Sequence, residues 1–519
     1  MLVSPGAHRE RQLSPRRNLL LSLTGIVGLA AGLRLPLLGH SSLWWDECHT
    51  LQVASAMHAA SPLRVLSAVF RGYSSYFLLL VPWVGSATSE WALRLPSVLA
   101  GMLLPGILLL LGREWGGDSL GWRAGVAAAI SPFLVWHSRE ARWYPFTWLL
   151  IAISAIAFLK VLRQPNWRWA LLCILVGLVA ATSYAPAILL VGTQALWFAC
   201  SAGPREEVRR AWSRSPLGVR ALVGLPVACC LIAGGVWIWS TLLAPVLSDG
   251  ARGFRFVNVG GPNLGAAAYT GVAFATGYTL GPGPSEWHRL SQIQLSFVEI
   301  AAMVLGALAF LGLVASGLVE LTKAQGPQFA GALLTLSTLP AAIILAASWW
   351  SDHAFAPRHV GVSYPFLVLL AAAGFPSPGR RRAAGALAAI LVALQALSLW
   401  NLYSNPRYQR EDVRDAAQYV TEHASMADLI LVFGGIDLPW KHYYRGETRW
   451  KMVYEPGGEA WPIERQGLGQ AVWTVEGMMW EGAGTQPVLA RVESDTVATE
   501  RREFPGRVIV TRREFRPQE

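Results

Sequence analysis

Long apolar runs recur along this chain, and they restrict its fold more than any other feature of the sequence. A helix needs about 20 predominantly apolar residues to cross a bilayer. Eleven runs approach or exceed this requirement, near residues 18–38, 95–112, 120–137, 144–162, 168–181, 183–200, 221–246, 296–320, 328–350, 359–375 and 383–402. The sequence therefore predicts a polytopic α-helical membrane protein with about eleven transmembrane helices. The run at 76–85 is too short to span and is expected at the membrane interface or as a re-entrant segment.

The composition agrees with a membrane protein. Hydrophobic residues make up 53% of the 519 residues and charged residues only 14%, whereas soluble domains carry roughly 25% charged residues. The five cysteines form neither a CxxC pair nor a zinc-ligand spacing. The sequence therefore predicts neither a disulfide framework nor a cysteine metal site.

The basic residues indicate an orientation. The amino terminus contains four arginines, and the densest basic connectors are "RQPNWR", "PREEVRRAWSRSPLGVR" and "PGRRR". Cytoplasmic loops are enriched in Lys and Arg. This predicts a cytoplasmic amino terminus with a retained first helix, and cytoplasmic connectors at 113–119, 163–168, 201–220, 321–327 and 376–382. Because the net charge of +11 is then explained by topology, no nucleic-acid partner is expected.

The composition changes after residue 402. The stretch "DVRDAAQYVTEHASMADLILVFGG" has the pattern of a polar helix followed by an apolar strand, and "AVWTVEG" and "GRVIVTRREF" resemble further strands. We therefore expect a transmembrane domain at 1–404 with outer loops at about 39–94 and 247–295. A small extracytoplasmic α/β domain is expected at 405–519.

Unusual polar residues gather in the predicted outer loops. They lie in "SLWWDECHT", "SPFLVWHSREARWYPF", "TSYAP" and "SDHAFAPRHV", and include Asp46, Glu47, Glu140, Arg142, Tyr144, Tyr184, Arg358 and His359. Each also has an ordinary explanation, as a solvated loop charge, a helix-capping pair or an interfacial residue. Ionisable groups at membrane depth nevertheless tend to mark function, so four distant loops are expected to form one cavity.

Several segments resemble the GT-C glycosyltransferases of the protein mannosyltransferase and aminoarabinose transferase type, over nearly the whole chain. The segments are "LRLPLLGHSSLWWDECHT", "EWALRLPSVLAG", "SPFLVWHSREARWYPF", "APRHVGVSYPFLVLLAAAG" and the tail. The resemblance implies a GT-C fold in a bacterial inner membrane. It also implies transfer of a sugar from a polyprenyl-phosphate donor to a lipid, polysaccharide or protein acceptor.

The resemblance also implies roles for the residues. Asp46 would be the general base, assisted by Glu47, and direct displacement by one base predicts inversion at the anomeric carbon. Arg142 and Arg358 would bind the donor phosphate, because guanidinium groups bind phosphate bidentately. Further substrate contacts are expected from Glu140, Tyr144, Tyr184 and His359.

The chain departs from the family at "RGYSSYFLLL", which lacks a His-Pro-Pro-like segment, and at "TSYAP", which replaces a His. No cofactor is certain, and a divalent cation stays open. Two other functional classes also stay open. A lipid or solute transporter, such as a flippase, would place ionisable residues in a cavity but usually shows internal repeats. A non-catalytic scaffold would bind polysaccharide through its outer domain.

Overall fold

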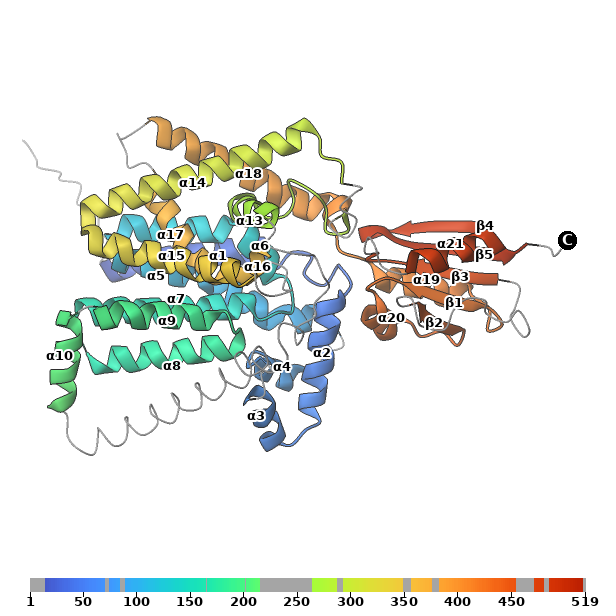
Figure 1. Ribbon diagram of the computed structural model, residues 1–519, viewed down its shortest axis with the longest axis horizontal. Coiled ribbons are helices and arrows are strands. Elements are labelled where there is room, and N and C mark those ends of the chain that lie inside the picture. The colour runs from blue at the N-terminus through green and yellow to red at the C-terminus, as the bar shows by residue number, and fades with distance from the viewer. Residues whose placement is uncertain are drawn as a thin grey trace, which may run out of the picture.

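A computed structural model describes residues 15–70, 74–84, 89–164, 166–200, 202–214, 264–286, 293–348, 356–375, 382–453, 471–479 and 485–516. Within these ranges the chain forms a helical bundle and a five-stranded sheet, which lies beyond one end of the bundle (Figure 1). We call this the sheet-facing end. The predicted span at 221–246 lies outside the described residues.

The bundle consists of helices that correspond to the predicted apolar runs. Its longer helices are α1 (Pro15–Arg34), α5 (Glu90–Ile130), α7 (Tyr144–Arg163), α8 (Trp167–Ser183), α9 (Ala187–Cys200), α14 (Phe297–Gln325), α15 (Pro327–Ala347), α17 (Tyr364–Gly374) and α18 (Arg382–Ser404). Among the described residues, five helices are long and apolar enough to cross a membrane, namely α5, α7, α14, α15 and α18. A helical membrane fold is therefore present, and the count of eleven spans stays a prediction.

Helix α5 contains a sharp turn that separates two of the predicted spans. Gly116 and Gly117 have non-helical backbone angles, and φ of Gly117 is +82°. A Cβ atom on Gly112 would lie only 2.8 Å from the Cα atom of Gly121. Residues nine positions apart in a straight helix are separated by about 13 Å, so the two arms fold back on each other. The predicted runs at 95–112 and 120–137 are thus two arms, and the second continues into α6 (Pro132–Ser138).

Three of the predicted cytoplasmic connectors meet at the end of the bundle opposite the sheet. Arg163 donates hydrogen bonds to the carbonyl oxygen of Glu114 and, at 3.4 Å, to Oε1 of Gln325. Lys160 Nζ lies 2.8 Å from Glu114 Oε1. The connectors near residues 114, 163 and 325 therefore share one side of the molecule, as the alternation of basic loops requires. Which side faces the cytoplasm stays a prediction.

Short helices cover the sheet-facing end. They are α2 (Trp45–His58), α3 (Pro62–Phe70), α4 (Phe77–Val84), α13 (Leu264–Thr276) and α16 (Pro357–Val360), which continues through the 3-10 turn η5 (Gly361–Ser363) into α17. At the opposite end, α10 (Ala202–Ser213) follows α9 (Figure 1). The run at 76–85 forms the eight-residue α4, which agrees with the prediction that this run is too short to span.

The chain after residue 404 begins with the turn η6 (Pro406–Tyr408) and forms a mixed α/β sheet. Its elements are α19 (Val413–His423), β1 (Leu429–Phe433), α20 (Asp437–Tyr443), β2 (Arg449–Val453), β3 (Ala471–Glu476), α21 (Thr485–Asp495), β4 (Thr496–Phe504), the turn η7 (Pro505–Arg507) and β5 (Val508–Phe515). The strand order is β2-β1-β3-β5-β4, and β1 runs parallel to β2 and β3. Elements α19, β1, β3 and β5 agree with the sequence pattern, whereas β2 and β4 were not predicted.

Candidate active site

Two arginines fix the loop between α1 and α2. Arg94 in α5 is buried, and its guanidinium donates to the carbonyl oxygens of Leu38, Ser41 and Ser42 at 2.6, 3.0 and 3.0 Å. Arg139, between α6 and α7, donates to the carbonyl oxygen of Leu37 at 3.2 Å. The carbonyl groups of this tight loop have no partner in a helix or a sheet, so the two arginines supply their hydrogen bonds. The start of α2 is therefore held at a defined place.

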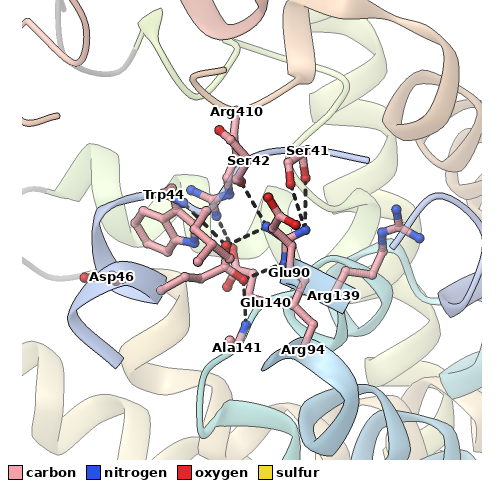
Figure 2. Close-up of polar contacts among 12 residues, drawn as sticks. Ser41, Ser42, Trp44, Asp46, Glu90, Arg94, Arg139, Glu140, Ala141 and Arg410 are labelled. Carbon is pink, nitrogen blue, oxygen red and sulfur yellow. Dashed lines mark hydrogen bonds and ion pairs between the residues drawn. The ribbon is translucent and has the colours of Figure 1, made fainter. Parts of the chain in front are cut away.

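Glu47 lies in the first turn of α2 and is completely buried. Its two carboxylate oxygens accept from Arg94 Nε at 2.8 Å and Nη2 at 2.7 Å. The backbone N–H of Ala141 also donates to it, at 2.8 Å. Figure 2 shows Arg94 and Ala141 pointing into this cluster, with Asp46 lying apart from it. The geometry of Glu47 is that of a group that joins α2 to the loop before α7.

Asp46 is adjacent in sequence but differs in environment. Its side chain is 19% exposed, and its Oδ2 lies 3.7 Å from Arg142 Nη2. Arg142 also donates to the Asp46 carbonyl oxygen and to Thr50 Oγ1, both at 3.2 Å, and its guanidinium lies 3.7 Å from the centre of the Trp143 ring. Arg142 Nε is buried and has no hydrogen-bond partner among the described residues. Asp46 is therefore accessible, beside a cation with one uncommitted donor.

Arg358, in α16, lies near the same place. Burial opposes its charge, but Tyr144 and Asp46 lie close enough to raise the pKa of its guanidinium. Tyr144 begins α7, and its ring lies 5.4 Å from that of Tyr184 in an edge-to-face arrangement. Five of the predicted residues, namely Asp46, Arg142, Tyr144, Tyr184 and Arg358, are therefore brought together. His359 follows Arg358 in α16 and is half-buried.

Glu140 takes part in a second network, centred on Arg410 and His137. Arg410 pairs with its Oε1, and His137 Nδ1 lies 3.1 Å from its Oε2. Burial disfavours the Glu140 anion, but Arg410 and His137 outweigh this effect and lower its pKa from 4.5 to about 2. A cavity of about 100 Å³ is lined by residues that include Glu47, Arg94, Glu140 and Arg410. Asp46 is not among the residues that line this cavity, but Arg358 lies near both carboxylates, so the two networks meet at Arg358.

Several residues of this region escaped the sequence analysis. Arg94 carried a signal, because a lone cation within an apolar helix requires a buried partner. His49 lies one helical turn after Asp46, stacks on Trp45 at 5.7 Å, and has its pKa lowered by burial and by the charge of Arg142. Its ring is therefore neutral at neutral pH and is a second candidate proton acceptor. Arg410 carried no signal, because its partner Glu140 is 270 positions away.

The described residues contain no group of three or more His, Cys, Asp or Glu side chains that could hold a metal ion. The candidate site is instead built from arginines, carboxylates and aromatic rings. Such a set can hold an anionic group by charge and by bidentate hydrogen bonds. It can also place a carboxylate or an imidazole next to that group as a proton acceptor.

Comparisons with known proteins give a family match for part of the chain and a likeness of fold for most of it. Residues 66–230 match the family of dolichyl-phosphate-mannose-protein mannosyltransferases. ArnT from Cupriavidus metallidurans, solved bound to undecaprenyl phosphate, aligns with a TM-score of 0.50 and 14% identity over 94% of this chain and 98% of that chain. The oligosaccharyltransferase of Archaeoglobus fulgidus, solved tethered to an acceptor peptide with the NVT sequon, aligns with a TM-score of 0.50 and 11% identity over 84% of this chain and 64% of that chain.

No curated protein sequence matches the chain. The family match covers residues 66–230, and the structural likeness at this low identity concerns the fold. The two findings are independent, because one rests on sequence and the other on the arrangement of the helices and the sheet. They agree with the resemblance found in the sequence: the chain has a helical GT-C-like membrane fold, and its residues 66–230 are similar to the dolichyl-phosphate-mannose-protein mannosyltransferases.

Proposed function

We propose that the chain is a membrane glycosyltransferase that moves a sugar from a polyprenyl-phosphate donor to an acceptor hydroxyl at the outer face of the membrane. One observation carries the proposal. The accessible carboxylate of Asp46 lies 3.7 Å from Arg142, whose buried Nε has no partner among the described residues. A base beside an uncommitted guanidinium is the pairing that a phosphate leaving group and a hydroxyl nucleophile require. The undecaprenyl phosphate bound by ArnT supports this class of donor.

The reaction needs one bond made and one broken. The acceptor oxygen attacks the anomeric carbon, its proton passes to the Asp46 carboxylate, and the bond from that carbon to the phosphate oxygen breaks with its electron pair going to the oxygen. The polyprenyl phosphate leaves with one more negative charge. Arg142 and Arg358 would stabilise this charge through planar, bidentate contacts. A single displacement inverts the anomeric configuration.

The remaining predicted residues fit supporting roles. Tyr144 and Tyr184 form an aromatic wall beside Arg358, suited to a sugar ring or to the phosphate. Glu47 would act on the reaction through the position of α2, because Arg94 engages both of its oxygens. Glu140 and His359 stay candidates for acceptor contacts. Whether His49 replaces Asp46 as the base is tested by comparing His49→Gln with Asp46→Asn.

The proposal includes the location and the division of the chain. Residues 1–404 would form the transmembrane catalytic domain in a bacterial inner membrane, with the amino terminus in the cytoplasm. Residues 405–519 would form the extracytoplasmic domain. The transporter alternative is not favoured by the comparisons, since the family match and the two aligned structures are glycosyltransferases.

The test is a transfer assay with the purified full chain in detergent. Undecaprenyl-phosphate sugars of several types are supplied with lipid, polysaccharide and peptide acceptors. The proposal predicts release of undecaprenyl phosphate and a glycosylated acceptor of inverted configuration. Transport of such lipids by reconstituted protein, without transfer to any acceptor, would support the transporter and contradict the proposal.

A further inference from the structure

The chain after residue 404 contacts each of the four residues that precede Asp46. The hydroxyl of Ser42 donates to the carbonyl oxygen of Glu411 at 2.7 Å. The backbone N–H of Leu43 donates to the hydroxyl of Tyr443 at 2.7 Å. These bonds come from two separate elements of the C-terminal region, the turn before α19 and the end of α20. They therefore bind the loop to that region in two places.

The two tryptophans are held in the same way. The indole Nε1 of Trp45 donates to Asp437 Oδ1 at 2.8 Å. The guanidinium of Arg410 lies 3.8 Å from the centre of the Trp44 ring, within the range of a cation–π contact. Arg410 also pairs with Glu140, two residues before Arg142. Figure 2 shows Arg410, Ser42 and Trp44 close to one another.

The transmembrane helices supply few contacts of this kind to the same stretch. Arg94 fixes the carbonyl oxygens of Leu38, Ser41 and Ser42. The side chains of Trp44 and Trp45, which set how α2 begins, are instead contacted by Arg410 and Asp437. Asp46 is the next residue, and its own side-chain contact with Arg142 is long, at 3.7 Å. Its direction therefore depends on how the preceding residues are held.

We propose that Arg410, Asp437 and Tyr443 are positioning residues, through which the C-terminal sheet region sets the place of Asp46 at the site. This inference rests on the proposed function, because one of its tests measures kcat for sugar transfer. A displacement of about 1 Å in a catalytic group can lower the rate about 100-fold. Loss of these contacts should therefore lower kcat, while the donor-binding residues Arg142 and Arg358 keep their own supports.

Four variants separate positioning from general damage. Asp437→Leu removes the acceptor of the Trp45 indole, whereas Asp437→Asn keeps an acceptor oxygen. Tyr443→Phe removes only the hydroxyl that Leu43 contacts, together with its bond to Glu90 at 2.9 Å. Arg410→Ala removes the contacts with Trp44 and Glu140.

Arg407→Ala is the matched control. Arg407 lies three residues before Arg410 in the same junction and pairs with Glu286 and Glu299. It therefore joins the C-terminal region to the bundle without contacting the residues before Asp46. Its side chain is 32% exposed, against 18% for Arg410, so solvent screens its ion pairs more strongly.

The measurements are kcat and donor KM for the full chain, together with hydrogen exchange of the amides of residues 42–50. We expect Asp437→Leu, Tyr443→Phe and Arg410→Ala to lower kcat about 10- to 100-fold, with donor KM changed by less than about threefold. Exchange at 42–50 should rise in the same variants while α7 stays protected. Asp437→Asn and Arg407→Ala should resemble the wild type.

Unchanged kcat and unchanged exchange in the three variants would overturn the inference. So would an equal loss of kcat in Arg407→Ala. If the wild type transfers no sugar, the proposed function fails, and the exchange data alone decide whether the C-terminal region holds the loop.

Discussion

Arg94 holds both carboxylate oxygens of Glu47, at 2.8 and 2.7 Å, and both side chains are buried. The pair joins α5 to the first turn of α2. Ala141 N–H, which precedes Arg142, donates to the same carboxylate at 2.8 Å. Glu47 directly follows Asp46, and its carboxylate thus binds the residue that directly precedes Arg142. The two sequence segments that supply the candidate base and the candidate phosphate ligand are coupled through it.

Glu47→Gln should therefore damage folding more than chemistry. Removing one partner of a buried ion pair costs about 3–5 kcal/mol, because the remaining charge is left uncompensated. We expect a lower unfolding midpoint in detergent and poor yield of folded protein. Glu114→Gln, which breaks the more exposed pair with Lys160, is the control and should cost about 0–1 kcal/mol. A Glu47→Gln protein of wild-type stability that has lost all turnover would instead make Glu47 catalytic.

Arg142→Lys and Arg358→Lys should weaken donor use. Lysine keeps the charge but cannot form a planar, two-pronged contact with phosphate. We expect the donor Kd to rise about tenfold in each, equal to ~1.4 kcal/mol. Arg123→Lys, at the opposite end of the bundle where Arg123 contacts the carbonyl of Phe375, should leave the donor Kd unchanged. Wild-type donor affinity in Arg358→Lys would remove Arg358 from the phosphate site.

Acid stability should depend on Glu140. Its pKa is lowered from 4.5 to about 2 in the folded chain, so the folded state binds its proton less readily than the unfolded state. This stabilisation is present above about pH 4.5 and is lost as the pH falls towards 2. Groups close to the Glu140 carboxylate include Arg410, His137 and Arg358. Arg410→Ala removes a charge that lowers the Glu140 pKa, so burial should raise this pKa. The stability contributed by the Glu140 anion should then be lost at a higher pH.

The measurement is the unfolding midpoint in detergent between about pH 3 and pH 7. The unfolding midpoints of wild type and Arg410→Ala should diverge as the pH falls. When Glu140→Gln is added to each of these two proteins, their midpoints should depend on pH in the same way. Parallel curves for wild type and Arg410→Ala would show that Arg410 does not set the ionisation of Glu140.

Reporter fusions test the orientation. Fusions after residues 214 and 404 should report opposite sides of the membrane, with the first in the cytoplasm, because the Arg-rich connectors alternate with the poorer ones. The described connectors near 114, 163 and 325 already meet at one end of the bundle. Reporters on the same side would refute the predicted order of spans.

The sequence predicted the helices well where composition alone decides the structure. The apolar runs that fall within the described residues form helices, and "TSYAP" separates α8 from α9 as expected. The runs at 95–112 and 120–137 were predicted as separate spans, and in the structure Gly116 and Gly117 turn the chain between them. Strand β4 was missed because its sequence, TVATERREF, is mostly polar and exposed at the edge of the sheet.

The sequence predicted those site residues that are unusual in their own segment, such as charged residues beside apolar runs. Asp46, Arg142 and Arg358 were expected to share a place, and their placement agrees with this expectation. The contrast between Asp46 and Glu47 could not be predicted, because it depends on Arg94, 47 residues away. Glu140 was expected in the same cavity as Asp46, which stays a prediction, and its pairing with Arg410, 270 positions away, could not be predicted. Such pairings follow from tertiary contacts that leave no periodic pattern in the sequence.

Turnover by Asp46→Asn shows directly whether Asp46 is the general base. The substitution keeps the size of the side chain and removes its basicity, and loss of a general base typically costs about 10²- to 10⁴-fold in rate. Transfer from a purified polyprenyl-phosphate sugar should fall by that factor in detergent. Donor binding and the unfolding midpoint should stay near those of the wild type. Wild-type turnover in Asp46→Asn would contradict the account.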